Sequence, residues 1–241
     1  MTAPRELTSR HTHAVVMRLL QDGKIPETVL DIPCGEGAFL ARLRQLGVEG
    51  HGSDIANRVT LPDAQFTPAD MNGHLPFANG AFDAIVCIDG IEHLERPFDF
   101  VRESHRVLRP GGVIVISTPN ISALRSRWRW LLTGFHNKGK TPLNERDPNP
   151  WHHVNLLSFP ELRYLLHRHG FRITAIATNR IKGVSWLYAP LWPVSAVVTA
   201  GALARWERDP DQRVRNGEIW RQMLTPAIAF GETMIVKAER V

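Results

Sequence analysis

The stretch "CIDGIEHLERP" (residues 87–97) contains three side chains that can carry out acid–base chemistry or bind a metal ion: Asp89, Glu92 and His93. If a helical turn begins at Asp89, they stand at positions i, i+3 and i+4 and share one face. Two carboxylates and an imidazole suit a hard divalent ion such as Mg²⁺ or Mn²⁺. Two alternatives remain open: His93 is a general base oriented by Glu92, or the stretch is a solvated turn whose acids cap the next helix.

A glycine turn lies upstream, in "TVLDIPCGEGAFLARL" (residues 28–43). An apolar run breaks into Pro-Cys-Gly-Glu-Gly and resumes at helical spacing. This order of strand, glycine turn and helix is typical of the first unit of a nucleotide-binding sheet. Gly35 and Gly37 would let a ligand approach the backbone beside a helix N-terminus.

The elements that must position these residues alternate between strands and helices. The expected strands are residues 28–33, 49–54, 65–70, 82–89 and 112–119, with later strands at 171–179 and 232–237. Helices are expected at residues 8–20, 96–108 and from Ser158 to near Gly170. This alternation predicts a doubly wound α/β Rossmann-like sheet of seven strands, parallel except for an antiparallel last strand, with helices on both faces. Ligands of such sheets bind beyond the carboxyl ends of the strands, where Asp54, Asp70 and Asp89 stand.

These motifs resemble the class I S-adenosylmethionine-dependent methyltransferases over residues 25–180 and the last ten. The first motif of the family matches "LDIPCGEG", with Pro33 where glycine is commonest, and its ribose-binding acid matches Asp54 in "HGSDI". The third to fifth motifs match "ADMNGHLPFANGAFDAIVCIDGIEHL" and "RVLRPGGVIVISTPN". The resemblance implies S-adenosyl-L-methionine as cofactor, bound by seven residues: Asp31, Gly35, Gly37, Asp54, Asp70, Met71 and Asp89.

Asp70 and Met71 are expected to bind the adenine amine and cover the ring, although a helix N-cap would also explain an aspartate at position 70. A nucleoside triphosphate fits poorly because no Gly-Lys-Ser/Thr follows the glycine turn. A dinucleotide dehydrogenase is disfavoured because Leu40 stands where the third glycine of its motif would fall.

The site is similar to two metal-dependent branches of the family, the quinone-biosynthesis O-methyltransferases and the small-RNA 3′-terminal 2′-O-methyltransferases. The RNA branch holds its metal with Glu-x-x-Glu-His and a later histidine. When this pattern is applied to the present sequence, Asp89 replaces the first glutamate, and Glu92 and His93 match directly. His153 in "NPWHHVN" fits the later histidine. The implied metal ligands are therefore Asp89, Glu92, His93 and His153, and the implied catalytic residues are His93 and Glu92. His153 as an ordinary loop residue is the alternative.

An uncharged insertion, "VSWLYAPLWPVSAVVTAGALA" (residues 184–204), precedes the last strand. Its length reaches the range of a membrane span, about twenty residues, but Pro190 and Pro193 favour an interfacial element. The segment "ALRSRWRWLLTGF" (residues 123–135) combines arginines with tryptophans, a composition that also favours contact with the membrane interface. The alternative is that both segments form a substrate lid or a homodimer interface.

The composition sets the remaining expectations. The chain of 241 residues has a formal net charge of +5 and two cysteines, too few for a disulfide framework, and shows no signal peptide. We expect a single cytoplasmic methyltransferase domain over residues 1–241, with peripheral attachment to the inner face of the membrane. The expected reaction is O-methylation of a small or lipid-linked acceptor, such as a quinone precursor or a glycan. The alternatives are an RNA ribose 2′-O-methyltransferase, less favoured because no long basic tract is seen, and a non-catalytic cofactor-binding protein.

Overall fold

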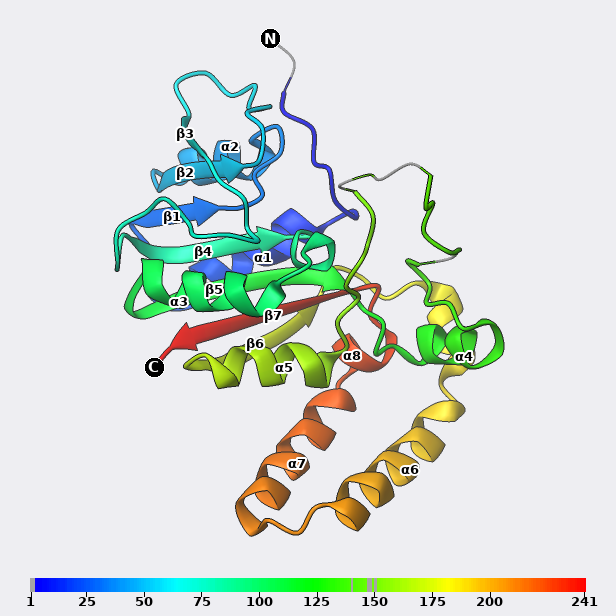
Figure 1. Ribbon diagram of the computed structural model, residues 1–241. Helices are drawn as coiled ribbons and strands as arrows, with labels where there is room; N and C mark the ends of the chain where they lie inside the picture. Colours follow the sequence, from blue (N-terminus) through cyan, green and yellow to red (C-terminus); the bar gives the residue numbers. More distant parts are fainter. Residues whose placement is uncertain (1–2, 140, 147–148, 150) are drawn as a thin grey trace.

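The computed structural model describes residues 3–139, 141–146, 149 and 151–241, and Figure 1 shows a central twisted sheet with helices on both sides. The sheet order is β3-β2-β1-β4-β5-β7-β6. Strands β1 to β5 pair in parallel, and β7 is antiparallel to both of its neighbours, β5 and β6. This confirms the predicted fold class. The strands are β1 (Thr28–Asp31), β2 (Glu49–Asp54), β3 (Gln65–Pro68), β4 (Phe82–Ile88), β5 (Leu108–Pro119), β6 (Phe171–Thr178) and β7 (Thr233–Arg240).

Alternating side chains divide the core into two layers, one on each face of the sheet. On one face Val29 and Val86 pack against helices α1 (Thr12–Gln21) and α2 (Ala38–Gln45). On the other face Leu30 and Ile85 pack against α3 (Pro97–Val107) and α5 (Phe159–Arg168). Each face is buried by helices, as a parallel sheet requires.

Most predicted element boundaries shift by a few residues. The strand predicted at 82–89 ends at Ile88, because Asp89 has φ 47° and leaves the extended conformation. The first helix begins at Thr12 rather than Thr8, and the last strand runs to Arg240 rather than Lys237. The Ser158 cap is confirmed, since the Ser158 hydroxyl accepts from the Glu161 N–H and the Glu161 carboxylate accepts from the Ser158 N–H.

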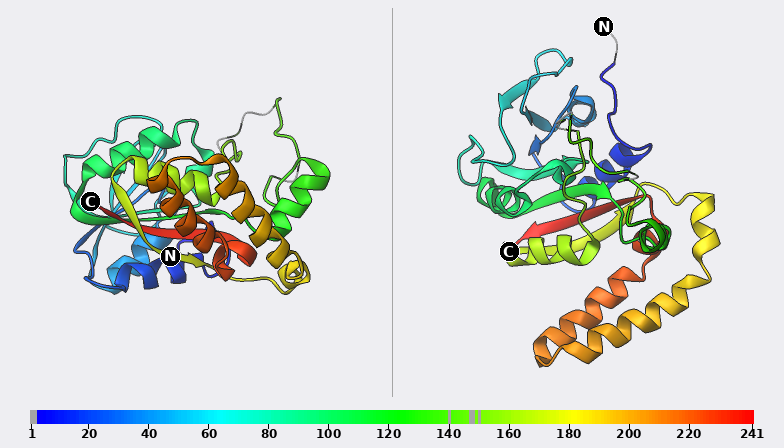
Figure 2. Two further views of the ribbon diagram at one scale, coloured as in Figure 1. Left: turned by 90° about the horizontal axis from the view of Figure 1, so that it is seen from below. Right: turned by 45° about the vertical axis from the view of Figure 1, so that its right-hand side comes forward.

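The insertion between β6 and β7 is helical. It consists of η2 (Gly183–Tyr188), α6 (Leu191–Trp206), α7 (Pro210–Met223) and α8 (Pro226–Phe230). Helices α6 and α7 form a hairpin that projects away from the sheet, as Figure 1 and the right-hand view in Figure 2 show. Among the described residues, no helix is both long and apolar enough to cross a bilayer.

Candidate functional site

A cavity of about 300 Å³ lies at the carboxyl edge of the parallel strands. Its walls bring together side chains that the sequence spreads over about a hundred residues. Five of the predicted site residues line it: Asp54, Asp70, Met71, Asp89 and His93. A second, smaller cavity of about 40 Å³ is lined by Asp31 and Gly35, and Pro33 contributes to both cavities. The two cavities together follow the edge from the glycine turn to the segment after β4.

Asp54 connects the end of β2 to the glycine turn. Its carboxylate accepts from the Gly35 N–H at 3.1 Å and from the Ile55 N–H at 2.8 Å. The side chain is buried yet lines the larger cavity. Asp54 therefore fixes the turn, and its carboxylate, which lines the cavity, can accept further hydrogen bonds.

Asp70 and Met71 also line the larger cavity. No helix follows Asp70, so it is not a helix N-cap. Its carboxylate accepts instead from the Asn72 N–H at 2.8 Å, which closes a local turn. Met71 is buried and presents its thioether side chain beside this polar group.

Asp31 carries a buried carboxylate at the end of β1. Its Oδ2 atom makes no hydrogen bond within the described residues. Burial first, and the nearby Asp54 second, raise the pKa of the Asp31 carboxyl well above its ordinary value. A buried polar atom without a partner costs free energy, so a ligand that donates a hydrogen bond from the smaller cavity would stabilise this site.

Asp89 does not take the position that a helical turn would give it. Its left-handed backbone places it before the 3₁₀ helix η1 (Ile91–His93) rather than within it. Its carboxylate accepts hydrogen bonds from the Thr8 hydroxyl at 2.6 Å and the Ser117 hydroxyl at 2.7 Å. Asp89 is consequently not on the same helical face as Glu92 and His93, in contrast to the prediction.

Glu92, His93 and His153 converge. One ligand atom from each lies within 4.8 Å of the others, and Asp89 is not part of this group. Glu92 is 1% exposed and accepts from the Thr118 hydroxyl at 3.0 Å. Burial, followed by the charge of Asp89, raises the pKa of Glu92 to about 8, so this carboxyl is largely protonated at neutral pH.

The His93 ring is held in one tautomer. Its Nδ1 lies 3.0 Å from the carbonyl oxygen of His152, and because a carbonyl only accepts, Nδ1 must carry the proton. Burial lowers the pKa values of both His93 and His153, which favours neutral rings. The Nε2 atom of His93 then holds a free electron pair, and the buried Nδ1 of His153 has no partner within the described residues.

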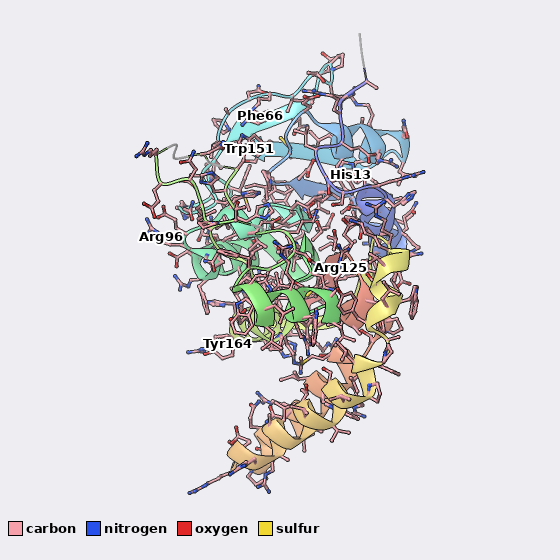
Figure 3. All side chains as sticks on the ribbon, turned by 90° about the vertical axis from the view of Figure 1, so that its right-hand side faces the viewer. His13, Phe66, Arg96, Arg125, Trp151 and Tyr164 are labelled. Atoms are coloured by element: carbon pink, nitrogen blue, oxygen red, sulfur yellow. The ribbon has the colours of Figure 1, made fainter. Side chains whose placement is uncertain are left out.

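Two further features of the site had not been predicted. The segment before α1 crosses the glycine turn, where Arg5 forms an ion pair with Glu36 at 2.5 Å. The Arg58 guanidinium lies 4.8 Å above the ring of Trp151, and both residues line the larger cavity. Figure 3 labels Trp151, which lies on the loop between α4 (Leu124–Thr133) and α5. These contacts join residues far apart in the chain, so no local sequence pattern predicts them.

Comparison with known proteins gives one consistent result. Residues 5–176 match the model of a methyltransferase domain family. The "Probable S-adenosylmethionine-dependent methyltransferase" of Mycolicibacterium smegmatis is 33% identical over 168 residues, covering 67% of this chain and 58% of that protein. The ubiquinone biosynthesis O-methyltransferase of Pseudomonas paraeruginosa is 30% identical over 111 residues, covering 41% of this chain and 47% of that protein. The chain thus spans about half the length of these curated relatives.

Solved structures agree on the fold. A SAM-dependent methyltransferase from Archaeoglobus fulgidus aligns with a TM-score of 0.57 at 19% identity, covering 95% of this chain and 92% of that one. A second SAM-dependent methyltransferase, from Mesorhizobium loti, aligns with a TM-score of 0.54 at 17% identity, covering 94% and 96%. These identities support a shared fold and no more.

Proposed function

Since the chain belongs to the methyltransferase domain family and is a class I S-adenosylmethionine-dependent methyltransferase, we propose that it methylates a hydroxyl group of a small or lipid-linked acceptor. The observation that carries this proposal is the neutral His93, whose Nδ1–H is held by the His152 carbonyl beside the larger cavity. A neutral imidazole with a free Nε2 is suited to accept the proton of a hydroxyl group.

The residues that line the two cavities fit the cofactor. Asp54 offers a carboxylate to the ribose hydroxyls, and Asp70 and Met71 offer an acceptor and an apolar surface to adenine. The unpartnered Oδ2 of Asp31 suits the amino group of the methionine part. When bound, S-adenosylmethionine supplies a methyl group on a sulfonium, which is already an activated electrophile.

The protein then has two tasks: to position the acceptor and to take up its proton. The walls of the larger cavity hold the acceptor hydroxyl beside Nε2 of His93, and positioning of this kind provides much of the rate enhancement. Nε2 accepts the hydroxyl proton while Nδ1–H stays bonded to the His152 carbonyl. Glu92 is protonated and bonded to Thr118. It therefore adds no negative charge to that of Asp89 in this part of the site.

The test measures transfer of a labelled methyl group from S-adenosylmethionine to phenolic acceptors in the presence of EDTA. His93→Ala should lose about 10²–10⁴-fold in kcat, while calorimetry shows unchanged affinity for S-adenosylhomocysteine. His167→Ala, on the exposed side of α5, is the matched control and should retain activity. Undiminished turnover by His93→Ala would refute the role of this histidine.

The convergence of Glu92, His93 and His153 favours a second candidate, metal-assisted methylation of an RNA ribose hydroxyl. Here the three residues would hold Mg²⁺ or Mn²⁺, which would acidify the accepting hydroxyl. Asp89 fits this set poorly because its carboxylate is engaged by Thr8 and Ser117. Loss of turnover in EDTA, restored by Mg²⁺ or Mn²⁺ and seen with RNA 3′ ends rather than phenols, would favour this candidate over the first.

A further inference from the structure

Apolar side chains gather on one outer surface, which we name the α4–α6 surface and define as α4 (Leu124–Thr133), η2 and residues 191–198 of α6. This surface holds half of the exposed large apolar side chains of the described residues, eleven of 22. They are Trp128, Trp130, Leu131, Leu132, Val184, Trp186, Leu187, Trp192, Val194, Val197 and Val198. A concentration of this kind marks an interaction surface rather than the scattered exposure that is normal in soluble proteins.

The parts of this surface are held together. Helix α4 contacts η2, and the Arg127 guanidinium donates to the Ser195 hydroxyl of α6 at 3.1 Å. Trp186 stacks on Phe230 of α8 with ring centroids 4.9 Å apart. On its other side α6 is tied to α7, where the Trp220 indole N–H donates to the Ala196 carbonyl at 2.9 Å. The elements that carry the exposed residues are therefore held in fixed positions relative to one another.

The surface lies at the same edge of the sheet as the cavities. Helix α4 follows the carboxyl end of β5, η2 follows that of β6, and η1 follows that of β4. These strands run in the same direction, because β7 is antiparallel to both β5 and β6. Figure 3, which turns this edge toward the viewer, shows α4 with Arg125 across the middle and α6 below it.

The charges identify the partner. Every charged residue in segments 120–139 and 182–206 is basic: Arg125, Arg127, Arg129, Lys138, Lys182 and Arg205. Lys138 and Lys182 face Glu232, and Arg127 donates to Ser195, so the argument rests on the absence of any acidic residue from these two segments. Two copies of this surface placed face to face would bring like charges together. An anionic bilayer complements them instead.

From these observations we propose that the α4–α6 surface docks on an anionic lipid bilayer. Helix α6 has 16 residues, fewer than the roughly 20 that a span requires, and so lies along the interface. Trp186 of η2, Trp192 of α6 and the tryptophans of α4 occupy the headgroup layer, where indole rings are favoured. Docking brings the cavity edge of the sheet close to the membrane. The proposal does not depend on which acceptor is methylated.

Vesicle flotation tests this with phosphatidylcholine alone and with phosphatidylcholine containing phosphatidylglycerol. The wild-type protein should float with the anionic vesicles and bind them more weakly at high salt. Val197→Asp should weaken binding by about tenfold or more, because it places a charge against the acyl layer. Val241→Asp is the matched control: Val197 and Val241 are 73% and 70% exposed, and Val241 lies at the opposite sheet edge.

Circular dichroism and sedimentation velocity complete the test. Both variants should keep the wild-type spectrum and melting temperature, since both sites are exposed. Three results would overturn the proposal. The first is wild-type protein that binds neither kind of vesicle. The second is a Val197→Asp variant that binds as well as Val241→Asp. The third is a wild-type dimer that Val197→Asp converts to a monomer, with no vesicle binding by either protein.

Discussion

Glu92 illustrates how one residue couples the site to the stability of the fold. Its pKa is raised from an ordinary value of 4.5 to about 8 because the carboxyl is buried near Asp89. Between these two values the folded protein binds one more proton at Glu92 than the unfolded chain does. The free energy of unfolding therefore falls as pH rises through this window, by about 1.4 kcal/mol per pH unit.

Glu92→Gln should remove this dependence. Denaturant unfolding at pH 5.5 and 7.5, in EDTA, should show a smaller loss of stability for the variant than for the wild type. Asp31 also has a raised pKa, but both proteins contain it, so the difference between them isolates Glu92. Glu27→Gln, an exposed change, should behave as wild type. Equal slopes for Glu92→Gln and wild type would show that Glu92 is charged in the folded protein.

Asp54 is the residue on which cofactor affinity should depend most directly. Removing its carboxylate in Asp54→Ala deletes the proposed acceptor for the ribose hydroxyls and releases the Gly35 N–H. We expect S-adenosylhomocysteine binding to weaken by about 1.5–3 kcal/mol, as for a hydrogen bond to a charged group. Calorimetry measures this, with Asp99→Ala on α3 as a control. Unchanged affinity would place the ribose elsewhere.

At the scale of elements, the junction of β4 and η1 depends on close packing against the glycine turn. A Cβ atom added at Gly90 would overlap the ring of Pro33 and approach Cys87 Sγ to 3.1 Å. Gly90→Ala should therefore destabilise the fold by about 1–3 kcal/mol, as overpacking does, and weaken cofactor binding. Gly183→Ala, where no atom lies within 4 Å, is the matched control. Equal melting temperatures for the two variants would contradict this packing argument.

The elements were largely predictable because strand alternation, glycine turns and the Ser158 cap are local signals. The larger cavity followed from them, since the carboxyl ends of parallel strands meet at one edge. The predicted shared face of Asp89, Glu92 and His93 was wrong, because the left-handed backbone of Asp89 breaks the helical spacing. The hydrogen bond from Thr8 to Asp89 joins residues 81 positions apart, which no periodicity can reveal.

Across the whole molecule, burial is unevenly distributed. Strands β4, β5 and β7 contain fully buried side chains, whereas no described side chain of α6 or α7 is buried. Hydrogen–deuterium exchange should consequently be slow in the three strands and much faster in the α6–α7 hairpin. Anionic vesicles should slow exchange in α6 more than in α7. Exchange in α6 as slow as in β5 without vesicles would disprove the first expectation.

The contacts of Arg5 and Thr8 have a practical consequence for anyone who purifies this protein. These residues contact Glu36 and Asp89, so an affinity tag fused ahead of them would sit beside the two cavities. Strand β7 instead carries the C-terminus to the opposite edge of the sheet, as Figure 1 shows. A tag placed after Val241 leaves both the two cavities and the α4–α6 surface accessible, and binding constants measured with it should match those of the untagged chain.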